Sequence, residues 1–564
     1  MKRRAEDSPA GRENSCEKSG LETRFIFITG GVSSSLGKGI AAASIGAIMK
    51  AARQRVFFQK LDPYLNVDSG TMNPFQHGEV FVTDDGAETD LDIGHYERFV
   101  NESLTRMSSI TAGQVFRTVL DNERRGEYLG GTVQYIPHVT DTIKERMHRA
   151  AKESKADIVI VEVGGTVGDI EGAVFLEAIR QLRSELGPNR TCHVHMGFVP
   201  HMEASDELKT KPMQHSVIKV RESGLQPDMI LARADRAIPM ELLDKISLFC
   251  GVRRDAVIPA PTLHSIYDVP LYLEQEHHIA EVMGRYLGLT LAPDMSEWEE
   301  GRRLHEEAQE HLIPIALVGK YLHVKDAYLS VYEAIRSAAV HHNHKADIML
   351  IDSEELESAG SPLWEDLKRC AGIVVPGGFG SRGVEGKMAA ARFARTQGVP
   401  YLGLCLGAQL MVIDFARDVL KDGTLTSQEF DEKKILDPSK YVVHFLPGQH
   451  EGKEKGGTLR LGAYTCAVQA GTKAFEAYGR SEISERHRHR YEFNNDFRVR
   501  LEKHGLVFSG IWPETGLAEI VEVEGHPFMV GTQFHPEFKS RPHHPHPMFA
   551  KFAEAALACH AGGL

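Results

Sequence analysis

The chain has few cysteines, and they lie far apart. Its 564 residues include only Cys16, Cys192, Cys250, Cys370, Cys405, Cys466 and Cys559. No two of them form a C-x-x-C pair, so the sequence predicts neither a disulfide framework nor a zinc cluster. This cysteine usage is typical of a reduced, cytoplasmic protein.

Long apolar runs and excess positive charge are missing as well. The longest mildly apolar stretch, 40–49, is too short to span a bilayer. The first twenty residues are polar and charged, which predicts a disordered tail (1–20) rather than a signal peptide. The formal net charge of -13 disfavours a non-specific nucleic-acid binder. We therefore expect neither a nucleic-acid partner nor a membrane partner.

Two α/β domains are predicted from the length and from a repeated pattern of apolar strand followed by helix. The first block opens with "RFIFITGG" (24–31) and carries helical patterns at 171–186 and 239–249. The second opens with "IPIALVGKY" (313–321) and ends in two strands joined by a turn at 525–527. A charged stretch separates the blocks, so we expect domains at 21–290 and 313–564 and a partly helical linker at 291–312.

A candidate phosphate loop, "ITGGVSSSLGKGI", follows the first predicted strand and precedes a helix. Its backbone N–H groups, the helix N-terminus and Lys38 can together attract phosphate. The loop departs twice from the common pattern G-x-x-x-x-G-K-[ST]. Five residues separate Gly31 from Gly37, and Gly39 stands where a hydroxyl would bind Mg²⁺. An ordinary strand-to-helix turn is the alternative, but the context favours phosphate binding.

Without that hydroxyl, a metal ion needs other ligands. Acidic candidates are Asp90 and Asp92 in one stretch, and Glu162 at the end of a predicted strand followed by Asp169 and Glu171 in another. Ligands bind outside the carboxyl ends of strands in such sheets, which favours Asp92 and Glu162 as the Mg²⁺ pair. Either residue alone could equally be a helix cap or a surface charge.

The stretch "YLGLCLGAQL" (401–410) has the form of a nucleophile elbow with Cys405 in the serine position. A lone cysteine is more often a small buried side chain. Here, flanking glycines permit a tight turn, and the start of a helix favours the thiolate. In "GTQFHPEF", His535 and Glu537 are two residues apart, so they can share one side of an extended chain and act as base and orienting group. The glycines of 375–383 and the N–H of Leu406 can form an oxyanion hole.

A histidine-rich patch, "RPHHPHP" (541–547), is the remaining unusual segment. It could bind a metal ion. However, no carboxylate or cysteine joins the histidines at ligand spacing, so we expect a solvated loop.

These motifs resemble two families. The P-GG, G-x-C-x-G and H-P-E elements resemble the class I (triad) glutamine amidotransferases, which release ammonia from glutamine. Residues 60–99, "GGTVGDIEG" (164–172) and "KTKPMQHSV" (209–217) resemble the CTP synthases, and the resemblance covers about 24–555. It implies an N-terminal P-loop, dethiobiotin-synthetase-like amidoligase domain with a parallel sheet and a C-terminal class I glutaminase α/β domain. The implied reaction converts UTP, ATP and glutamine to CTP, ADP, phosphate and glutamate.

The resemblance also implies residue roles. The implied catalytic residues are Cys405, His535 and Glu537. The implied ATP-binding residues are Ser35, Leu36, Gly37, Lys38, Gly39, Ile40, Lys60 and Asp92, with Mg²⁺ on Asp92 and Glu162. UTP or CTP would contact Ser34, Asp169, Ile170, Glu171, Lys209, Thr210, Lys211, Pro212, Met213, Gln214 and Lys245. Glutamine would contact Gly378, Leu406, Gly407, Ala408, Gln409, Glu429 and Arg490. His77 would lie on the ammonia path, and the family implies GTP as allosteric activator, CTP as feedback inhibitor and a homotetramer.

Other functions fit part of the pattern. Another ATP-dependent glutamine amidotransferase, such as a cobyrinic-acid amidase, would share the two-domain plan but not residues 60–99. A GMP synthetase would carry an S-G-G-x-D-S loop, which the sequence lacks. A non-catalytic nucleotide-sensing scaffold would be expected to lose the triad or Lys38, and both are present.

Overall fold

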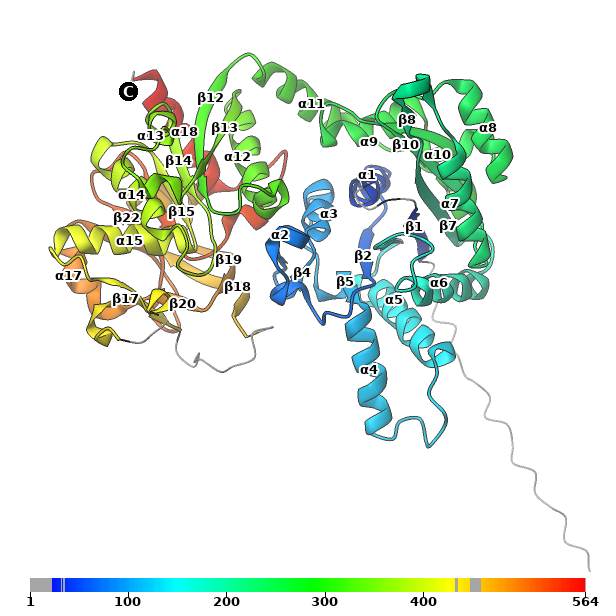
Figure 1. Cartoon of the computed structure of the whole chain (residues 1–564), viewed down its shortest axis with the longest axis horizontal. Helices are drawn as coiled ribbons and strands as arrows, with labels where there is room; N and C mark the ends of the chain where they lie inside the picture. The colour runs from blue at the N-terminus through cyan, green and yellow to red at the C-terminus, as the bar shows by residue number, and fades with distance from the viewer. Residues whose placement is uncertain (1–22, 32, 34–35, 432–434, 447–457, 563–564) are drawn as a thin grey trace, which may run out of the picture.

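The computed structural model describes residues 23–562 except for 32, 34–35, 432–434 and 447–457. Two α/β domains lie side by side, and helix α11 (Ser296–Ala308) connects them along one edge (Figure 1). The predicted tail at 1–20 and the predicted nucleotide-binding residues Ser34 and Ser35 lie outside the described residues. Within the described ranges, every helix is too short or too polar to cross a membrane.

The first domain is built on a seven-stranded, wholly parallel sheet. Its strands, in spatial order, are β11 (Val257–Pro261), β10 (Met229–Ala234), β7 (Thr191–Phe198), β1 (Arg24–Gly30), β6 (Ile158–Val163), β2 (Val56–Asp62) and β5 (Ser109–Thr111). Nearly all residues of β1, β6 and β2 are buried. Burial on both faces explains why these strands are continuous apolar runs in the sequence.

Helices and two short hairpins surround this sheet. The helices are α1 (Lys38–Ala51), α2 (Pro74–His77), α3 (Asp92–Val100), α4 (Ala112–Arg124), α5 (Thr140–Ser154), α6 (Ala173–Leu186), α7 (Lys211–Glu222), α8 (Met240–Cys250), α9 (Val269–Leu271) and α10 (Ile279–Leu287). The hairpins pair β3 (Phe81–Val82) with β4 (Glu88–Thr89), and β8 (His201–Met202) with β9 (Glu207–Leu208). The helices predicted at 171–186 and 239–249 are confirmed as α6 and α8, with ends that differ from the prediction by at most two residues.

The second domain contains a nine-stranded mixed sheet. Its strands, in spatial order, are β13 (Lys345–Asp352), β12 (Leu312–Gly319), β14 (Gly372–Val375), β15 (Tyr401–Leu404), β23 (Met529–Thr532), β22 (Ala518–Val523), β21 (Leu506–Ile511), β18 (Arg460–Val468) and β19 (Glu482–His489). The strands from β13 to β23 are parallel, and the others are antiparallel. The predicted strand pair around 525–527 is confirmed as β22 and β23, and Gly525 takes a left-handed φ of 74° in the turn. The predicted α/β class is therefore confirmed for both domains.

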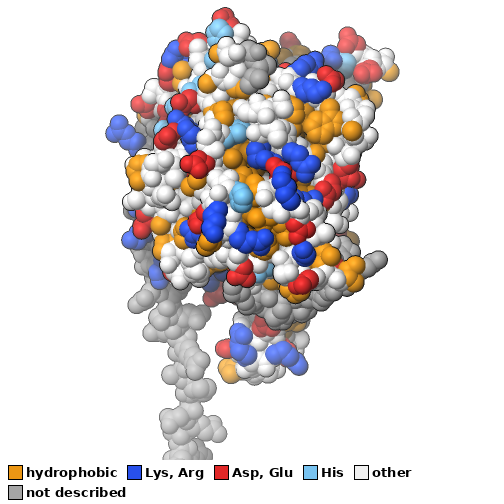
Figure 2. All heavy atoms as spheres, turned by 90° about the vertical axis from the view of Figure 1, so that its left-hand side faces the viewer, with side chains coloured by type: hydrophobic (Ala, Val, Ile, Leu, Met, Phe, Trp, Pro, Cys, Tyr) orange, Lys and Arg blue, Asp and Glu red, His pale blue; other side chains and the backbone are white. Residues whose placement is uncertain are grey.

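A small sheet and further helices complete this domain. The small sheet contains β16 (Thr426–Ser427), β17 (Tyr441–Phe445) and β20 (Tyr491–Phe493). The helices are α12 (Leu329–His341), α13 (Leu363–Lys368), α14 (Val384–Gln397), α15 (Leu406–Val419), α16 (Lys473–Tyr478), α17 (Arg498–Glu502) and α18 (Pro547–Ala561). Figure 2 shows this end of the molecule, where acidic, basic and apolar side chains are mixed over the surface.

The two domains share apolar contacts as well as the connecting helix. Trp298 of α11 and Phe538 of the C-terminal half both belong to the hydrophobic core of the first domain. The Phe538 ring packs edge-on against Phe81, with ring centroids 5.0 Å apart. Because Phe538 directly follows Glu537, the interface lies beside the predicted glutaminase triad.

Candidate functional site

Cys405 occupies a sharp turn between strand β15 and helix α15. Its φ of 50° and ψ of -102° are unusual for a residue with a side chain. Its main-chain N–H donates to the carbonyl of Thr532 at 2.7 Å, which ties the turn to β23. This strained strand-to-helix turn is the geometry of a nucleophile elbow, as the G-x-C-x-G motif predicts.

His535 and Glu537 lie beside that turn. Nδ1 of His535 is 2.7 Å from Oε1 of Glu537, and both side chains are buried. A Cβ atom built on Gly377 would lie 3.7 Å from Cβ of Cys405 and 3.8 Å from Nε2 of His535, so the cysteine and the imidazole flank the same point. Burial lowers the pKa of His535, but the charges of Glu537 and Cys405 outweigh burial and raise that pKa to about 10. This raised pKa favours the protonated imidazole next to the cysteine.

The loop that follows β14 is held by a buried lysine. Nζ of Lys320 donates to the carbonyls of Phe379 at 2.5 Å, Gly380 at 3.0 Å and Arg382 at 3.3 Å. Burial lowers the pKa of Lys320 to about 8. Because one ammonium group binds three carbonyls of the loop, Lys320 holds the loop in place. Gly378 of this loop lies close to Leu406 of the elbow.

The residues predicted to hold glutamine lie around the same turn. Oε1 of Glu429 accepts the Gly380 N–H at 2.7 Å, and the charge of Arg490 acts on Glu429. Nε2 of Gln409 donates to the Tyr491 carbonyl at 2.9 Å. The structure thus brings together the whole predicted set, which is Gly378, Leu406, Gly407, Ala408 and Gln409 at the elbow and its facing loop, with Glu429 and Arg490 beside them.

Two residues of this site were missed in the sequence. Gln533 lies between the predicted groups, because its Nε2 is 3.6 Å from Sγ of Cys405 and its Oε1 is 3.1 Å from Nε2 of Gln409. Its position two residues before His535 could have predicted this, because alternate residues of an extended chain share one side and Gln533 therefore lies on the same side as His535. Lys320 gave no such signal, because a lysine after a strand is usually exposed.

The phosphate loop of the first domain leads into α1 as predicted. Lys38 is the first residue of α1, and Gly37 before it takes a left-handed φ of 93°. Nζ of Lys38 donates to the Gly165 carbonyl at 2.8 Å, and burial lowers the pKa of Lys38. Leu36 and Gly39 are also buried, and Ile40 is partly buried. The start of α1 therefore carries a buried ammonium group beside the end of β6.

Asp92 and Glu162 lie close enough to share one cation. Nζ of Lys60 donates to Oε1 of Glu162 at 2.8 Å and also contacts the Asp92 carboxylate. Burial raises the pKa of Glu162. Burial also acts to raise the pKa of Asp92, but the charge of Lys60 outweighs it and lowers that pKa. The Asp92 carboxylate lies against Gly39, at the position where a P-loop would carry its hydroxyl.

This pair fits a Mg²⁺ ion that also binds phosphates. Mg²⁺ takes oxygen ligands and is commonly held by one or two carboxylates together with substrate phosphates. Glu162 supplies a buried carboxylate and Asp92 a partly buried one, both beside Lys38 and Lys60. Throughout the described part of the chain, no group of three or more His, Cys, Asp or Glu side chains could hold a metal by itself. The phosphates of a nucleotide would therefore have to complete the coordination shell.

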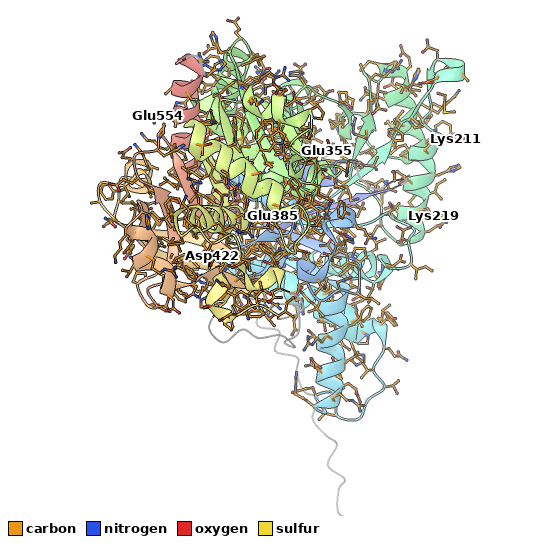
Figure 3. All side chains as sticks on the ribbon, turned by 60° about the vertical axis from the view of Figure 1, so that its left-hand side comes forward. Lys211, Lys219, Glu355, Glu385, Asp422 and Glu554 are labelled. Atoms are coloured by element: carbon orange, nitrogen blue, oxygen red, sulfur yellow. The ribbon has the colours of Figure 1, made fainter. Side chains whose placement is uncertain are left out.

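The lysines predicted to bind UTP or CTP are exposed at the start of α7 and on α8. Nζ of Lys211 lies 6.0 Å from the ring centroid of Phe249 on α8, and the charges of Lys209 and Lys245 both act on Glu207. Lys211 projects outward from α7 in Figure 3. These contacts place the three lysines on one surface.

The other predicted uridine-site residues are near α7. Thr210 and Gln214 form a hydrogen bond of 3.0 Å, Met213 is buried, and Pro212 lies in the first turn of α7. Asp169, Ile170 and Glu171 form an exposed loop before α6. Among the described residues, no hydrogen bond or ion pair joins this loop to the three lysines.

Two further predictions concern histidines. The ring of His77, at the end of α2, packs against Tyr64 with centroids 6.1 Å apart. The prediction of a solvated histidine loop at 541–547 is wrong for His546, which is buried, caps α18 and lies 3.0 Å from Oε1 of Glu485. His543 packs edge-on against Trp298. The proline-broken sequence concealed these contacts, because both partners are distant along the chain.

Comparison with known proteins identifies both halves. Residues 24–289 match the family model of the CTP synthase N-terminus, and residues 323–555 match that of class I glutamine amidotransferases. A CTP synthase of Dehalococcoides mccartyi is 54% identical over 537 residues, which cover 95% of this chain and 97% of that protein. A CTP synthase of Moorella thermoacetica is 52% identical over 544 residues, which cover 96% and 100%.

A solved structure of the glutaminase domain of a Trypanosoma brucei CTPS, with bound acivicin, is 36% identical. It covers 44% of this chain and 94% of its own, with a TM-score of 0.40. The full-length relatives at more than half identity carry the assignment. This chain belongs to the CTP synthase family, the glutamine-hydrolysing ligases that use ATP to convert UTP to CTP in pyrimidine biosynthesis.

Proposed function

We propose that Cys405, His535 and Glu537 release ammonia from glutamine in the second domain, and that the first domain adds this ammonia to UTP. The observation that carries this proposal is the strained elbow at Cys405 facing the His535–Glu537 pair. A reactive cysteine needs a neighbouring histidine and a group that orients the histidine, and this arrangement supplies both.

The glutaminase step follows from the geometry. The Cys405 thiolate attacks the side-chain amide carbon of glutamine, and a C–S bond forms. N–H groups of Gly378 and Leu406 stabilise the oxyanion. His535 gives its proton to the departing nitrogen as the C–N bond breaks, so ammonia leaves and a glutamyl thioester remains. Water, activated by His535, then hydrolyses the thioester to glutamate and restores the thiolate.

Recognition of glutamine uses opposite charges. Glu429 can bind the α-ammonium group and Arg490 the α-carboxylate, since the two side chains lie close enough for their charges to interact. Gly407, Ala408 and Gln409 form the first turn of the helix beneath the substrate. Free glutamine is thus distinguished from a glutamine residue within a peptide, whose α-amino and α-carboxyl groups are uncharged amides.

The first domain would hold ATP on the phosphate loop. Lys38 and Lys60 would contact the phosphates, with Ser35, Leu36, Gly37, Gly39 and Ile40 forming the cradle. Asp92 and Glu162 would hold Mg²⁺, which neutralises phosphate charge when bound. Phosphoryl transfer to the 4-oxygen of UTP needs mainly positioning and charge neutralisation, and the two lysines supply positive charge. Ammonia then displaces the phosphate and gives CTP.

UTP and the product CTP would share one site. Lys209, Lys211 and Lys245 can bind the triphosphate that both nucleotides carry. Ser34, Asp169, Ile170, Glu171, Thr210, Pro212, Met213 and Gln214 would complete the site. Feedback inhibition by CTP follows, because the two nucleotides differ mainly at the 4-position of the base.

The remaining proposals concern assembly and regulation. The hairpin that begins at α4 projects from the first domain (Figure 1) and exposes 92% of Leu129 and 65% of Tyr135. Exposed apolar side chains on a projecting element support a subunit interface, here in a homotetramer.

Family membership supports activation by GTP, a cytoplasmic location and His77 on the ammonia path. We also propose domains at 21–290 and 313–564 with the linker at 291–312.

The nitrogen source tests the proposed function. Cys405→Ala should abolish CTP formation from glutamine and leave CTP formation from ammonium largely intact, measured by the absorbance change of uracil to cytosine. Cys370→Ala is the matched control, because Cys370 is equally buried but its sulfur contacts Met349 and the Asp366 carbonyl instead of the triad. If folded Cys405→Ala protein loses both activities or keeps both, the assignment of Cys405 is wrong.

A further inference from the structure

Strand β19 connects the predicted triad to the other domain. The carbonyl of Arg486 accepts the His535 N–H at 2.8 Å, and the carbonyl of Arg488 lies 3.8 Å from Sγ of Cys405. Alternate residues of a strand point to the same side, so both arginine side chains extend in one direction. That direction leads into the first domain.

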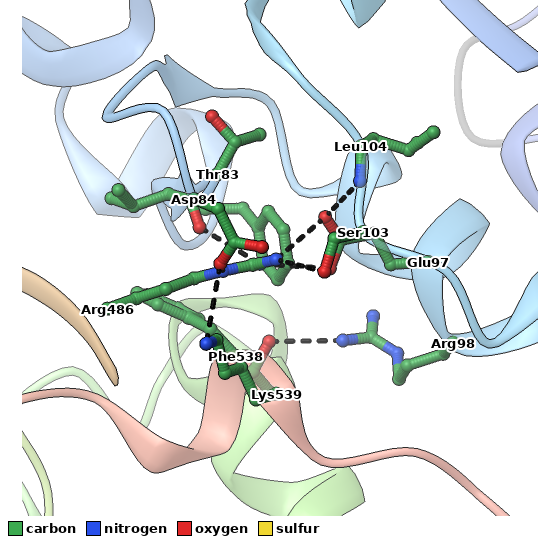
Figure 4. A network of polar contacts seen from close by, with 12 residues as sticks. Thr83, Asp84, Glu97, Arg98, Ser103, Leu104, Arg486, Phe538 and Lys539 are labelled. Atoms are coloured by element: carbon green, nitrogen blue, oxygen red, sulfur yellow. Dashed lines mark hydrogen bonds and ion pairs between the residues drawn. The ribbon is translucent and has the colours of Figure 1, made fainter. Parts of the chain in front are cut away.

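Arg486 gives all of its N–H donors to the first domain. An arginine has five such donors. Nε binds Asp84 at 2.6 Å, Nη1 binds the Val82 carbonyl at 3.1 Å and Glu97 at 2.9 Å, and Nη2 binds Glu97 and Ser103 at 3.1 Å each. Figure 4 shows this network, and the Arg486 side chain is fully buried in it.

Glu97 is the matching anion on α3. Its Oε1 accepts Arg486 and the Leu104 N–H, and its Oε2 accepts Arg486 and, at 2.7 Å, Nη2 of Arg541. Nη1 of Arg541 donates to the carbonyl of Phe538, three residues before it. The carboxylate therefore accepts four hydrogen bonds, and three of them come from Arg486 and Arg541, in segments next to the triad.

Arg488 repeats the arrangement two residues later. Its Nε binds Oε1 of Glu88 in the first domain at 2.9 Å, and Nη2 lies 3.4 Å from the Gly70 carbonyl. Phe538 adds an apolar contact, because its ring stacks on His535 at 5.1 Å and packs edge-on against Phe81. Cys405 is thus linked to the first domain through Arg488, and His535 is linked to it through Phe538.

We propose that Arg486 and Arg488 are positioning residues for glutamine hydrolysis, anchored by Glu97 and Glu88 of the ATP- and UTP-binding domain. Buried charges are tolerated only when fully paired, so β19 keeps its place only while the domains are docked in this way. The docked strand holds the backbone of His535 and the sulfur of Cys405. The inference rests on the proposed roles of these two residues.

Glu97→Gln in the full-length enzyme tests the proposal. This change keeps the side-chain size and removes the charge that binds Arg486 and Arg541. We expect kcat for glutamine hydrolysis to fall about 10- to 100-fold, because small misplacement of a reacting group has effects of this size. KM for glutamine should change less than kcat, since the side chains of Glu429 and Arg490 bind Gly380 and Thr458 of their own domain and not Glu97. The rate at which iodoacetamide alkylates Cys405 should fall with kcat, and CTP formation from ammonium should persist.

Tyr267→Phe is the matched control. It removes another bond between the domains, from Tyr267 Oη to Oε2 of Glu333 at 2.7 Å, which does not involve β19. Its glutaminase kcat should stay within about twofold of wild type. If Glu97→Gln does not fold, Glu88→Gln tests the same idea through Arg488.

Three results would overturn the proposal. They are an unchanged kcat and alkylation rate in the folded variant, an equal loss in Tyr267→Phe, and an equal loss of CTP formation from ammonium. The proposed function is tested separately by Cys405→Ala, because only that variant reports whether Cys405 is the nucleophile.

Discussion

Gly39 and Asp92 are a matched pair: a Cβ atom on Gly39 would lie 2.0 Å from Oδ1 of Asp92. Real Cβ atoms do not approach an oxygen so closely, so the carboxylate can stay in place only if residue 39 is glycine. This explains why the loop lacks the hydroxyl of the common P-loop pattern. A carboxylate from α3 occupies the position that the hydroxyl would take.

Restoring the P-loop hydroxyl should therefore inactivate the first domain. We expect Gly39→Ser to displace Asp92 and to lower CTP formation from ammonium by about 100-fold or more, as misplaced groups in a phosphoryl-transfer site do. Glutamine hydrolysis should persist. Gly423→Ala is the control, since nothing lies within 4 Å of a Cβ atom there. If the Gly39→Ser variant is active, the close contact between Gly39 and the Asp92 carboxylate is not needed for CTP formation.

Removing the charge of Asp92 tests the metal assignment. Asp92→Asn keeps the size of the side chain but weakens a Mg²⁺ ligand, so CTP formation from ammonium should be abolished at ordinary Mg²⁺ concentrations. Glutamine hydrolysis should survive, because the triad lies in the other domain. Titration with Mg²⁺ at saturating ATP measures the effect. Full synthesis at low Mg²⁺ would show that other groups hold the metal.

A single site for UTP and CTP predicts that one substitution weakens the binding of both nucleotides. Lys245→Ala should raise KM for UTP and the inhibition constant of CTP by similar factors, about tenfold for loss of one charge-assisted contact. Inhibition by CTP should be competitive with UTP in the wild type. Steady-state rates at varied UTP and CTP, with ammonium as nitrogen source, give both constants. A change in only one constant would require separate sites.

Much of the fold and the elbow could be predicted because their signals are local. The strand–helix rhythm, the glycines around Cys405 and the spacing of His535 and Glu537 are all visible in short windows. The contacts of Arg486 could not be predicted, since it meets Glu97 across 389 residues of sequence. His546 shows the same limit, because its partner Glu485 is 61 residues away.

The His535–Glu537 pair predicts a pH dependence. Glu537 is the strongest influence that raises the pKa of His535 to about 10, against the opposing effect of burial. A raised histidine pKa stabilises the fold fully below the ordinary pKa near 6.5, and this stabilisation is lost as pH rises through about 10. Glu537→Gln should therefore lower Tm most at pH 6 and least at pH 10.

The same variant should shift the activity profile. With Glu537 neutralised, the pKa of His535 falls, so its proton is lost at lower pH and the alkaline limb of kcat/KM for glutamine moves down. Loss of a correctly charged general acid costs about 10²- to 10⁴-fold at neutral pH. Thermal unfolding and pH–rate profiles check the two effects independently. An unshifted alkaline limb would mean that another group supplies the proton.

The last prediction concerns the buried lysine behind the oxyanion loop. Lys320 is only 2% exposed and binds three carbonyls of the loop that contains Gly378. Lys320→Met keeps the length and apolar bulk of the side chain but leaves those carbonyls without a donor, so the loop should shift away from Cys405. A lost oxyanion donor costs about 10²- to 10³-fold in kcat, and we expect a loss of this size in glutamine hydrolysis with CTP formation from ammonium retained. Arg382→Lys is a milder comparison, because its side chain binds the Lys320 carbonyl at 2.8 Å but supplies no donor to the loop. If Lys320→Met hydrolyses glutamine at the wild-type rate, the loop holds its position without the lysine.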